Sequence, residues 1–193
     1  MIPLVIAGLV LLGGSIAVAR RPEISVPEQR VFRAVNGWPD WLYPILWLPM
    51  QLGNLVVGTV AGIVVVVALG DWWAIIPVII AMLLKLVTER FLRRQFADLL
   101  DVRRRPGTSM PGATLRGDVP ADGPSFPSGH VLLVTAIACV VAAVGPGWVD
   151  AIAFALAVTV AVGRVYVGAH NPLDVTAGFG AGLVIGAVMG AFV

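Results

Sequence analysis

Apolar runs long enough to cross a bilayer recur along this sequence of 193 residues, and they limit it to a membrane fold. The first, residues 2–19, is about as long as an α-helix must be to span the hydrocarbon core. Hydrophobic residues make up 59% of the chain and charged residues only 12%, far from the composition of a soluble domain. We therefore expect an all-α integral membrane protein.

Six apolar segments follow one another, and we interpret each as one transmembrane helix. Together they predict a six-helix bundle that forms a single domain over residues 1–193. The second segment is interrupted near Pro49 and Gly53, and the last ends at Val193 without a polar tail, which leaves a longer parent protein open. The segments are residues 2–19, about 41–69, about 72–84, 131–144, 149–167 and 173–193.

A ridge of small residues lies on the last segment. Gly178, Gly182, Gly186 and Gly190 recur every four residues and so share one helix face. Glycines in such a row let a neighbouring backbone approach closely. We interpret the ridge as tight packing inside one bundle rather than as a dimer seam, and a homo-oligomer remains an open alternative.

A short amphipathic segment follows the first apolar run. Ser25 and Glu28 have the spacing of a capping box, and Val31, Phe32 and Val35 share an apolar face of the helix that would begin there. The sequence thus predicts a helix over about residues 26–36 that lies in the membrane interface.

The charged residues gather on one side of the predicted bundle. Residues 98–126 are polar and rich in Gly and Pro, and a connection of this length predicts a functional loop over the active site. All thirteen Lys and Arg residues lie on this side or at its border, which favours the cytoplasmic face of the cell membrane. Because the arginines flank apolar spans and form no soluble basic face, we expect no binding of nucleic acid.

Pro127-Ser128-Gly129-His130 marks the point where the polar loop meets the fourth apolar segment. A helix that begins here presents unpaired amides and the positive end of its dipole, which together suit a phosphate group. Gly129 lets an anion approach the backbone, Ser128 adds a hydroxyl donor, and His130 can transfer a proton at neutral pH. The structural alternative is Ser128 as an N-cap with His130 at a solvated helix end.

A second polar group lies at the border between the fifth and sixth segments. Arg164 is followed after five residues by His170, and after three more by Asp174. Asn171 and Pro172 have the pattern of an N-cap and a first helical residue, which puts Asp174 in the first turn. Asp174 can then accept a hydrogen bond from one imidazole nitrogen of His170 and leave the other as a nucleophile. Arg164 offers a planar fork for phosphate oxygens, and the structural alternatives are a capping box and a snorkelling arginine.

Lys85 is the only lysine and lies within an apolar helix, where a charged side chain is a functional candidate by default. An i, i+4 ion pair with Glu89 is the structural alternative, and Lys85 can serve both Glu89 and a substrate. A run of three arginines, residues 103–105, follows in the polar loop.

These groups resemble the motifs of the type 2 phosphatidic acid phosphatases (PAP2), a superfamily that also includes bacterial acid phosphatases and vanadium haloperoxidases. The second motif of that family, Pro-Ser-Gly-His, matches residues 127–130 fully. In the third motif Arg164, His170 and Asp174 match, while Gly163 replaces the usual serine. The resemblance implies the helical core shared by PAP2 proteins and haloperoxidases.

The first motif of that family, a lysine followed after six residues by Arg-Pro, matches less well. After Lys85 and six further residues comes Leu92, and Arg93 is the nearest basic residue. An Arg-Pro pair occurs only at Arg105-Pro106. We favour a longer gap that returns Arg105 to the site, with Arg93 as the competing assignment.

The resemblance also implies a mechanism. His170 attacks phosphorus to give a phosphohistidine, His130 protonates the departing alcohol and later activates water, and Asp174 fixes the tautomer of His170. No metal ion or other cofactor is expected, since the sole cysteine, Cys139, lies in an apolar run and the chain has two histidines. The implied phosphate-binding residues are Lys85, Arg105, Ser128, Gly129 and Arg164.

The implied substrate is a lipid phosphate, because the reactive residues cluster where lipid headgroups lie. Phosphatidic acid, phosphatidylglycerol phosphate, and polyprenyl phosphates or diphosphates all remain open. One alternative is a lipid phosphotransferase, in which an alcohol rather than water accepts the phosphoryl group. The other is a non-catalytic membrane protein that binds a lipid headgroup, although binding alone needs no nucleophile.

Overall fold

The computed structural model describes residues 1–21, 23–95 and 103–193, without the side chain of Arg93. Residues 98–102 of the predicted loop lie outside this description. The described residues form helices and no β-strand, which confirms the all-α expectation. The helices are α1 (Ile2–Ala19), α2 (Val26–Asn36), η1 (Asp40–Leu42), α3 (Tyr43–Met50), η2 (Gln51–Gly53), α4 (Leu55–Ala68), α5 (Ile75–Gln95), α7 (Pro106–Ser109), α8 (Gly129–Val144), α9 (Gly147–Tyr166), α10 (Pro172–Met189) and η3 (Gly190–Phe192).

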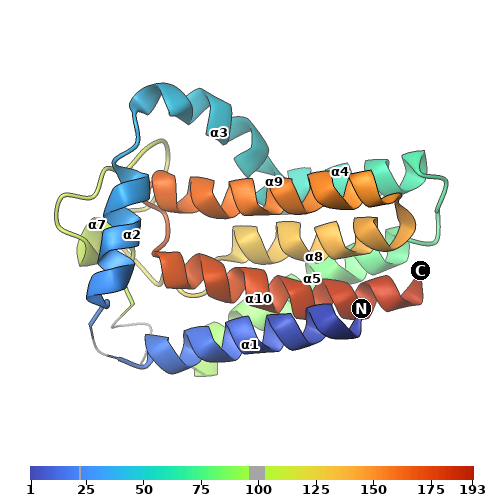
Figure 1. Cartoon of the computed structure of the whole chain (residues 1–193), viewed down its shortest axis with the longest axis horizontal. Coiled ribbons are helices and arrows are strands. Elements are labelled where there is room, and N and C mark those ends of the chain that lie inside the picture. The colour runs from blue at the N-terminus through green and yellow to red at the C-terminus, as the bar shows by residue number, and fades with distance from the viewer. Residues whose placement is uncertain (22, 96–102) are drawn as a thin grey trace.

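Helix α8 is the centre of the bundle. It packs against α4, α5, α9 and α10, and α10 packs in turn against α1 (Figure 1). Every residue of α8 from 131 to 141 is buried, whereas α1 exposes most of its side chains. Helix α2 crosses the end of the bundle at which α9 ends and α10 begins (Figure 1). An apolar helix that is buried all round is the expected core of such a bundle.

The predicted count of six spans is not confirmed. Among the described residues, α1, α9 and α10 with η3 are long and apolar enough to cross a membrane. A fourth span results if Asp40–Gly53 and Leu55–Ala68 are one broken segment, bent by 77° near the predicted interruption. Helix α8 is apolar but has only 16 residues. Helix α5 has 21 residues, but its second half carries several charged side chains.

The glycine ridge of α10 faces α8. A Cβ atom on Gly178 would overlap the carbonyl oxygen of Ser128, and one on Gly186 would overlap that of Ala136. A Cβ atom on Gly182 would lie 2.6 Å from the carbonyl oxygen of Leu132. The two backbones are thus in direct contact, which confirms the interpretation of the ridge as packing inside one bundle.

Helix α2 matches the predicted amphipathic segment. Ser25 caps it by accepting a hydrogen bond from the N–H of Glu28 at 3.4 Å. Glu28, Phe32 and Asn36 recur every four residues and are buried. Val31, predicted on the same face as Phe32, is instead exposed, so this part of the prediction is wrong. The predicted capping box is only half formed, because the Glu28 carboxylate turns toward the inside of the protein.

Candidate active site

The two sequence motifs meet at the end of the bundle that α2 crosses. His130 is the second residue of α8, and His170 lies in the turn between α9 and α10. The N–H of His170 donates to the carbonyl oxygen of Arg164 at 3.3 Å, so the last turn of α9 holds the backbone of His170. The N–H of Ser128 donates to the carbonyl oxygen of Asp174 at 2.9 Å and joins the start of α8 to that of α10.

The imidazole of His170 is oriented by a backbone carbonyl. Its Nδ1 lies 2.8 Å from the carbonyl oxygen of Ser125, and 4.0 Å from Oδ2 of Asp174. The predicted hydrogen bond between His170 and Asp174 is therefore replaced by one to Ser125. Because a carbonyl oxygen can only accept, Nδ1 carries the proton and Nε2 keeps its lone pair.

The electrostatic surroundings keep His170 neutral. Burial lowers the pKa of His170 well below 6.5, and the positive charges of Arg164 and Arg105 lower it further. His170 is therefore an uncharged base at neutral pH. An imidazole with a defined tautomer and a free lone pair is a competent nucleophile.

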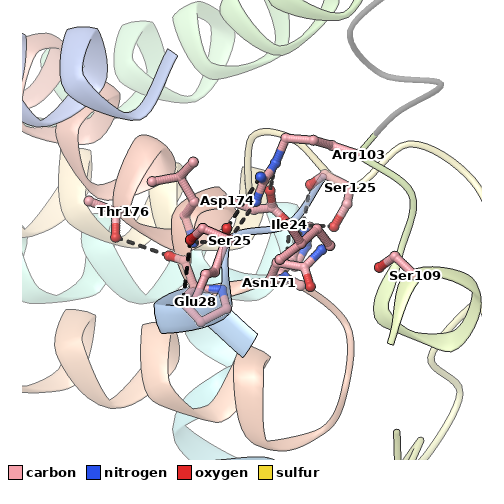
Figure 2. A network of polar contacts seen from close by, with 12 residues as sticks. Ile24, Ser25, Glu28, Arg103, Ser109, Ser125, Asn171, Asp174 and Thr176 are labelled. Atoms are coloured by element: carbon pink, nitrogen blue, oxygen red, sulfur yellow. Dashed lines mark hydrogen bonds and ion pairs between the residues drawn. The ribbon is translucent and has the colours of Figure 1, made fainter. Parts of the chain in front are cut away.

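Asp174 organises the polar groups behind His170 (Figure 2). Its Oδ2 accepts hydrogen bonds from the hydroxyl of Ser125 at 2.5 Å and from the N–H of Asn171 at 2.8 Å. Its Oδ1 accepts from Nε of Arg103 at 3.1 Å. Asp174 thus holds the helix start, as one alternative predicted, and reaches His170 through Ser125.

Arg103 was not predicted as a site residue. It is 2% exposed, and its guanidinium pairs with Glu28 at 2.6 Å as well as with Asp174. Burial opposes the charge on Arg103, but the carboxylates of Asp174 and Glu28 outweigh burial and raise its pKa. Residues 103–105 pair in antiparallel fashion with residues 123–125, so alternate arginines point inward.

Arg105 lies beside His170. Its Nη1 donates to the carbonyl oxygen of Ala169, the residue before His170, at 3.0 Å. Arg105 therefore lies next to His170, where a longer gap in the first motif was expected to place it. The side chain of the competing Arg93 lies outside the described residues, and phosphate binding by Arg105 stays a prediction.

At this end of the bundle, two buried donors have no hydrogen-bond partner within the part of the chain that the structure describes. They are Nε of Arg164 and the hydroxyl of Ser128. Ser128 occupies the N-cap position of α8 but makes no side-chain cap, contrary to the structural alternative. Its N–H is engaged by Asp174, so the amides that remain for an anion begin at Gly129.

Lys85 and Glu89 form the alternative ion pair, with Nζ and Oε2 2.7 Å apart. The pair lies against the start of α8, since a Cβ atom on Gly129 would be 2.7 Å from Oε2 of Glu89 and 3.0 Å from Cε of Lys85. Glycine at this position lets Lys85 approach the second motif. Lys85 is paired with Glu89 here, and a contact between Lys85 and phosphate stays a prediction.

Gly163, where the family has serine, lies against Met50. A Cβ atom on Gly163 would be 2.7 Å from Cγ and 2.8 Å from Sδ of Met50. The thioether therefore takes the space that a serine side chain needs. The hydroxyl that the family motif places here has no counterpart in this pocket.

An apolar cavity of about 380 Å³ lies between α4, α8 and α9. It begins at Leu52 and Val134 and extends to Leu69 and Trp148. Val134 is one helical turn after His130, so the cavity starts next to the predicted proton donor. Its lining suits a hydrocarbon chain.

Comparisons with known proteins identify the family and the fold. A family model described as the PAP2 superfamily matches residues 53–193. The crystal structure of LpxE from Aquifex aeolicus is 25% identical, covers 84% of this chain and 92% of that chain, and has a TM-score of 0.69. The structure of a transmembrane PAP2 type phosphatidylglycerolphosphate phosphatase from Bacillus subtilis is 22% identical, covers 96% of this chain and 94% of that chain, and has a TM-score of 0.68.

A shorter match is to an undecaprenyl-diphosphatase from Sulfolobus acidocaldarius, which is 46% identical over 55 residues. The matched region covers 28% of this chain and 27% of that relative. The two solved structures thus cover 84% and 96% of this chain. The match to the undecaprenyl-diphosphatase covers only about a quarter of either protein.

Proposed function

Because the chain belongs to the PAP2 superfamily, we propose that it hydrolyses a lipid phosphate through a phosphohistidine on Nε2 of His170. The observation that carries this proposal is the hydrogen bond between Nδ1 of His170 and the carbonyl oxygen of Ser125 at 2.8 Å. It assigns the proton to Nδ1 and leaves Nε2 as the attacking atom. The neutral state of His170 supports the same role.

The reaction has two steps. Nε2 of His170 attacks phosphorus and the bond between phosphorus and the lipid oxygen breaks. His130, whose protonated form the negative charge of the bound phosphate would stabilise, gives its proton to that oxygen. His130 then takes a proton from water, whose oxygen attacks phosphorus while the bond to Nε2 breaks and inorganic phosphate leaves. A positioned general acid of this kind typically contributes about 100- to 10,000-fold.

Positive charge around the site would stabilise the transferring phosphoryl group. Arg164 and Ser128 supply buried donors that no described residue satisfies, and Arg105 is held beside His170. Lys85 and the amide of Gly129 complete the predicted phosphate-binding set. Fixed donors and cations aimed at the phosphoryl oxygens supply the transition-state stabilisation that phosphoryl transfer requires, so the chemistry has no step that calls for a metal ion.

The apolar cavity between α4, α8 and α9 supports a lipid as the leaving group. His130 protonates the departing oxygen, and the cavity begins one turn from His130, so the hydrocarbon chain would continue from that oxygen into the cavity. The names of the similar proteins include a phosphatidylglycerolphosphate phosphatase and an undecaprenyl-diphosphatase. We accordingly propose lipid phosphate monoesters and diphosphates as the substrate class, acted on in the cell membrane.

A headgroup-binding protein without catalysis fits the site less well. A neutral imidazole with a lone pair on Nε2 adds nothing to the binding of an anion. A phosphotransferase uses the same first step and differs only in the acceptor, so the products distinguish it from a phosphatase.

The test is phosphate release by the detergent-purified protein, in the presence of a chelator, from a panel of lipid phosphates and diphosphates. We expect release by the wild type, none by His170→Ala, and an acid-labile phosphoenzyme after rapid quenching of the wild type alone. Arg104→Gln, which alters an exposed arginine, is the matched control. Turnover by His170→Ala would contradict the mechanism, and a phosphorylated alcohol in place of free phosphate would identify a phosphotransferase.

A further inference from the structure

A buried series of charged and polar groups runs from Glu28 of helix α2 to Ser125 (Figure 2). Glu28 of α2 pairs with Arg103, Arg103 pairs with Asp174, and Asp174 accepts a hydrogen bond from Ser125. The carbonyl of Ser125 in turn accepts the proton of Nδ1 of His170. We propose that Arg103 and Glu28 are positioning residues that determine which nitrogen of His170 is protonated. This inference rests on the proposed role of His170 as the nucleophile.

Burial strengthens the interactions between these charged groups. Asp174 is fully buried, Arg103 is 2% exposed and Glu28 is 8% exposed, so water does not screen their charges. Arg103 is the partner of Oδ1 of Asp174 in the described contacts, while Oδ2 is occupied by Ser125 and Asn171. A buried carboxylate that lost this cation would keep an uncompensated charge and would rearrange.

Arg103 holds Ser125 by two independent routes. The carbonyl oxygen of Arg103 accepts a hydrogen bond from the N–H of Ser125 at 3.2 Å, within the antiparallel pair of segments. The guanidinium of Arg103 fixes Asp174, whose carboxylate accepts the hydroxyl of Ser125. Both routes bear on the position of the Ser125 carbonyl, which accepts the Nδ1 proton of His170.

Glu28 makes helix α2 part of the same unit. Its Oε1 accepts from Nη2 of Arg103 at 2.6 Å and from the N–H of Leu173 at 3.0 Å. Leu173 belongs to the first turn of α10, directly before Asp174. Glu28 therefore joins α2 both to the cation and to the helix that carries Asp174, which is more than an interfacial anchor requires.

The chain contains two histidines, which makes their tautomers measurable one by one. The experiment is NMR of protein labelled with ¹⁵N-histidine in detergent without substrate, with His130→Gln used to assign the signals of His170. The same samples are assayed for kcat and KM. The variants are Arg103→Gln and Glu28→Gln, and the matched control is Arg104→Gln, whose side chain is 49% exposed.

We expect the wild type and Arg104→Gln to hold the proton of His170 on Nδ1. Arg103→Gln should show a mixture of both tautomers and a kcat lower by about 100-fold, with KM changed less than about twofold, as misplacement of a reacting group predicts. Glu28→Gln should move both readouts in the same direction by a smaller factor. It keeps an acceptor for Leu173, so it tests the inference even if Arg103→Gln does not fold.

The inference is overturned if both variants keep the wild-type tautomer and kcat, or if the wild type carries the proton on Nε2. Stability alone, the competing explanation, would lower the melting temperature of the variants without altering the tautomer. A wild type with the Nδ1 tautomer that releases no phosphate from any lipid would instead contradict the proposed function, and would leave the positioning of His170 by Arg103 intact.

Discussion

Nδ1 of His170 lies 4.0 Å from Oδ2 of Asp174, and Ser125 joins the two side chains with both of its oxygen atoms. The hydroxyl of Ser125 donates to the carboxylate, and its carbonyl accepts from the imidazole. The carboxylate of Asp174 therefore acts on His170 through Ser125. The tautomer of His170 depends first on the main-chain carbonyl of Ser125.

Asp174→Asn should consequently leave weak activity. The Ser125 carbonyl still accepts the proton of Nδ1, so we expect kcat to fall about 100-fold through misplacement of the imidazole. Loss of the correct tautomer in a triad with a direct contact costs about 10,000-fold. Single-turnover phosphate release measures the difference, and a loss as complete as that of His170→Ala would contradict the indirect arrangement.

His130→Gln should discriminate between leaving groups. An alkoxide leaves poorly without a proton, so we expect the rate with a lipid phosphate to fall about 100- to 10,000-fold. The p-nitrophenolate ion leaves without protonation, and the loss with p-nitrophenyl phosphate should be much smaller. Steady-state rates with both substrates check this, and equal losses would exclude His130 as the acid.

The pH profile should show that His170 stays neutral below the ordinary histidine pKa. Burial, Arg164 and Arg105 lower its pKa well below 6.5, so protonation of the nucleophile should not reduce kcat/KM as the pH falls through 6.5. Arg105→Gln removes one of these positive charges, and the acidic limb due to His170 should move to higher pH. Ionisation of the substrate affects the wild type and Arg105→Gln equally, so it cancels in the comparison. Identical acidic limbs in the two pH profiles would show that Arg105 does not act on His170.

Gly178→Ala should destabilise the contact between α8 and α10. Its Cβ would overlap the carbonyl oxygen of Ser128, a main-chain atom that cannot rotate away, and we expect a loss of about 1–3 kcal/mol in the free energy of unfolding. Gly13→Ala in α1 is the matched control, because its Cβ would meet nothing within 4 Å. The melting temperatures of the two variants are compared in detergent. Equal values would mean that the backbones of α8 and α10 are too far apart for this overlap.

Ala61→Phe should restrict the apolar cavity. Ala61 lines the cavity from α4, so a larger side chain should raise KM for long-chain lipid phosphates by about tenfold relative to short-chain ones. Val64→Phe places the same ring on an exposed face of α4, where Val64 is 59% exposed. The measurement is KM for lipid phosphates of increasing chain length. Equal effects of Ala61→Phe and Val64→Phe would show that the lipid chain does not occupy this cavity.

Local patterns predicted much of this arrangement. Helix α2, the start of α10 at Asn171, the glycine ridge and the ion pair of Lys85 with Glu89 all follow from spacings of three or four residues. The count of six spans is not confirmed where α8 is short and α5 is charged, since length and composition do not report which helices a bundle buries.

The contacts behind His170 could not be predicted in the same way. Glu28, Arg103 and Ser125 are far from Asp174 in sequence, and nothing local distinguishes Arg103 from the next arginine until residues 103–105 pair with 123–125. The spacing of His170 and Asp174 suggested a direct contact, but His170 precedes the N-cap of α10. The rule that residues i and i+4 share a face applies only within a helix.

The glycine contacts between α8 and α10 have a consequence for the two histidines at their ends. Transmembrane helices change their tilt with the thickness of the bilayer. Helices that touch through their peptide groups tilt as one rigid body, because no side chain between them can yield. The distance between His130 and His170, the proposed proton donor and nucleophile, is therefore insulated from the lipid composition of the membrane.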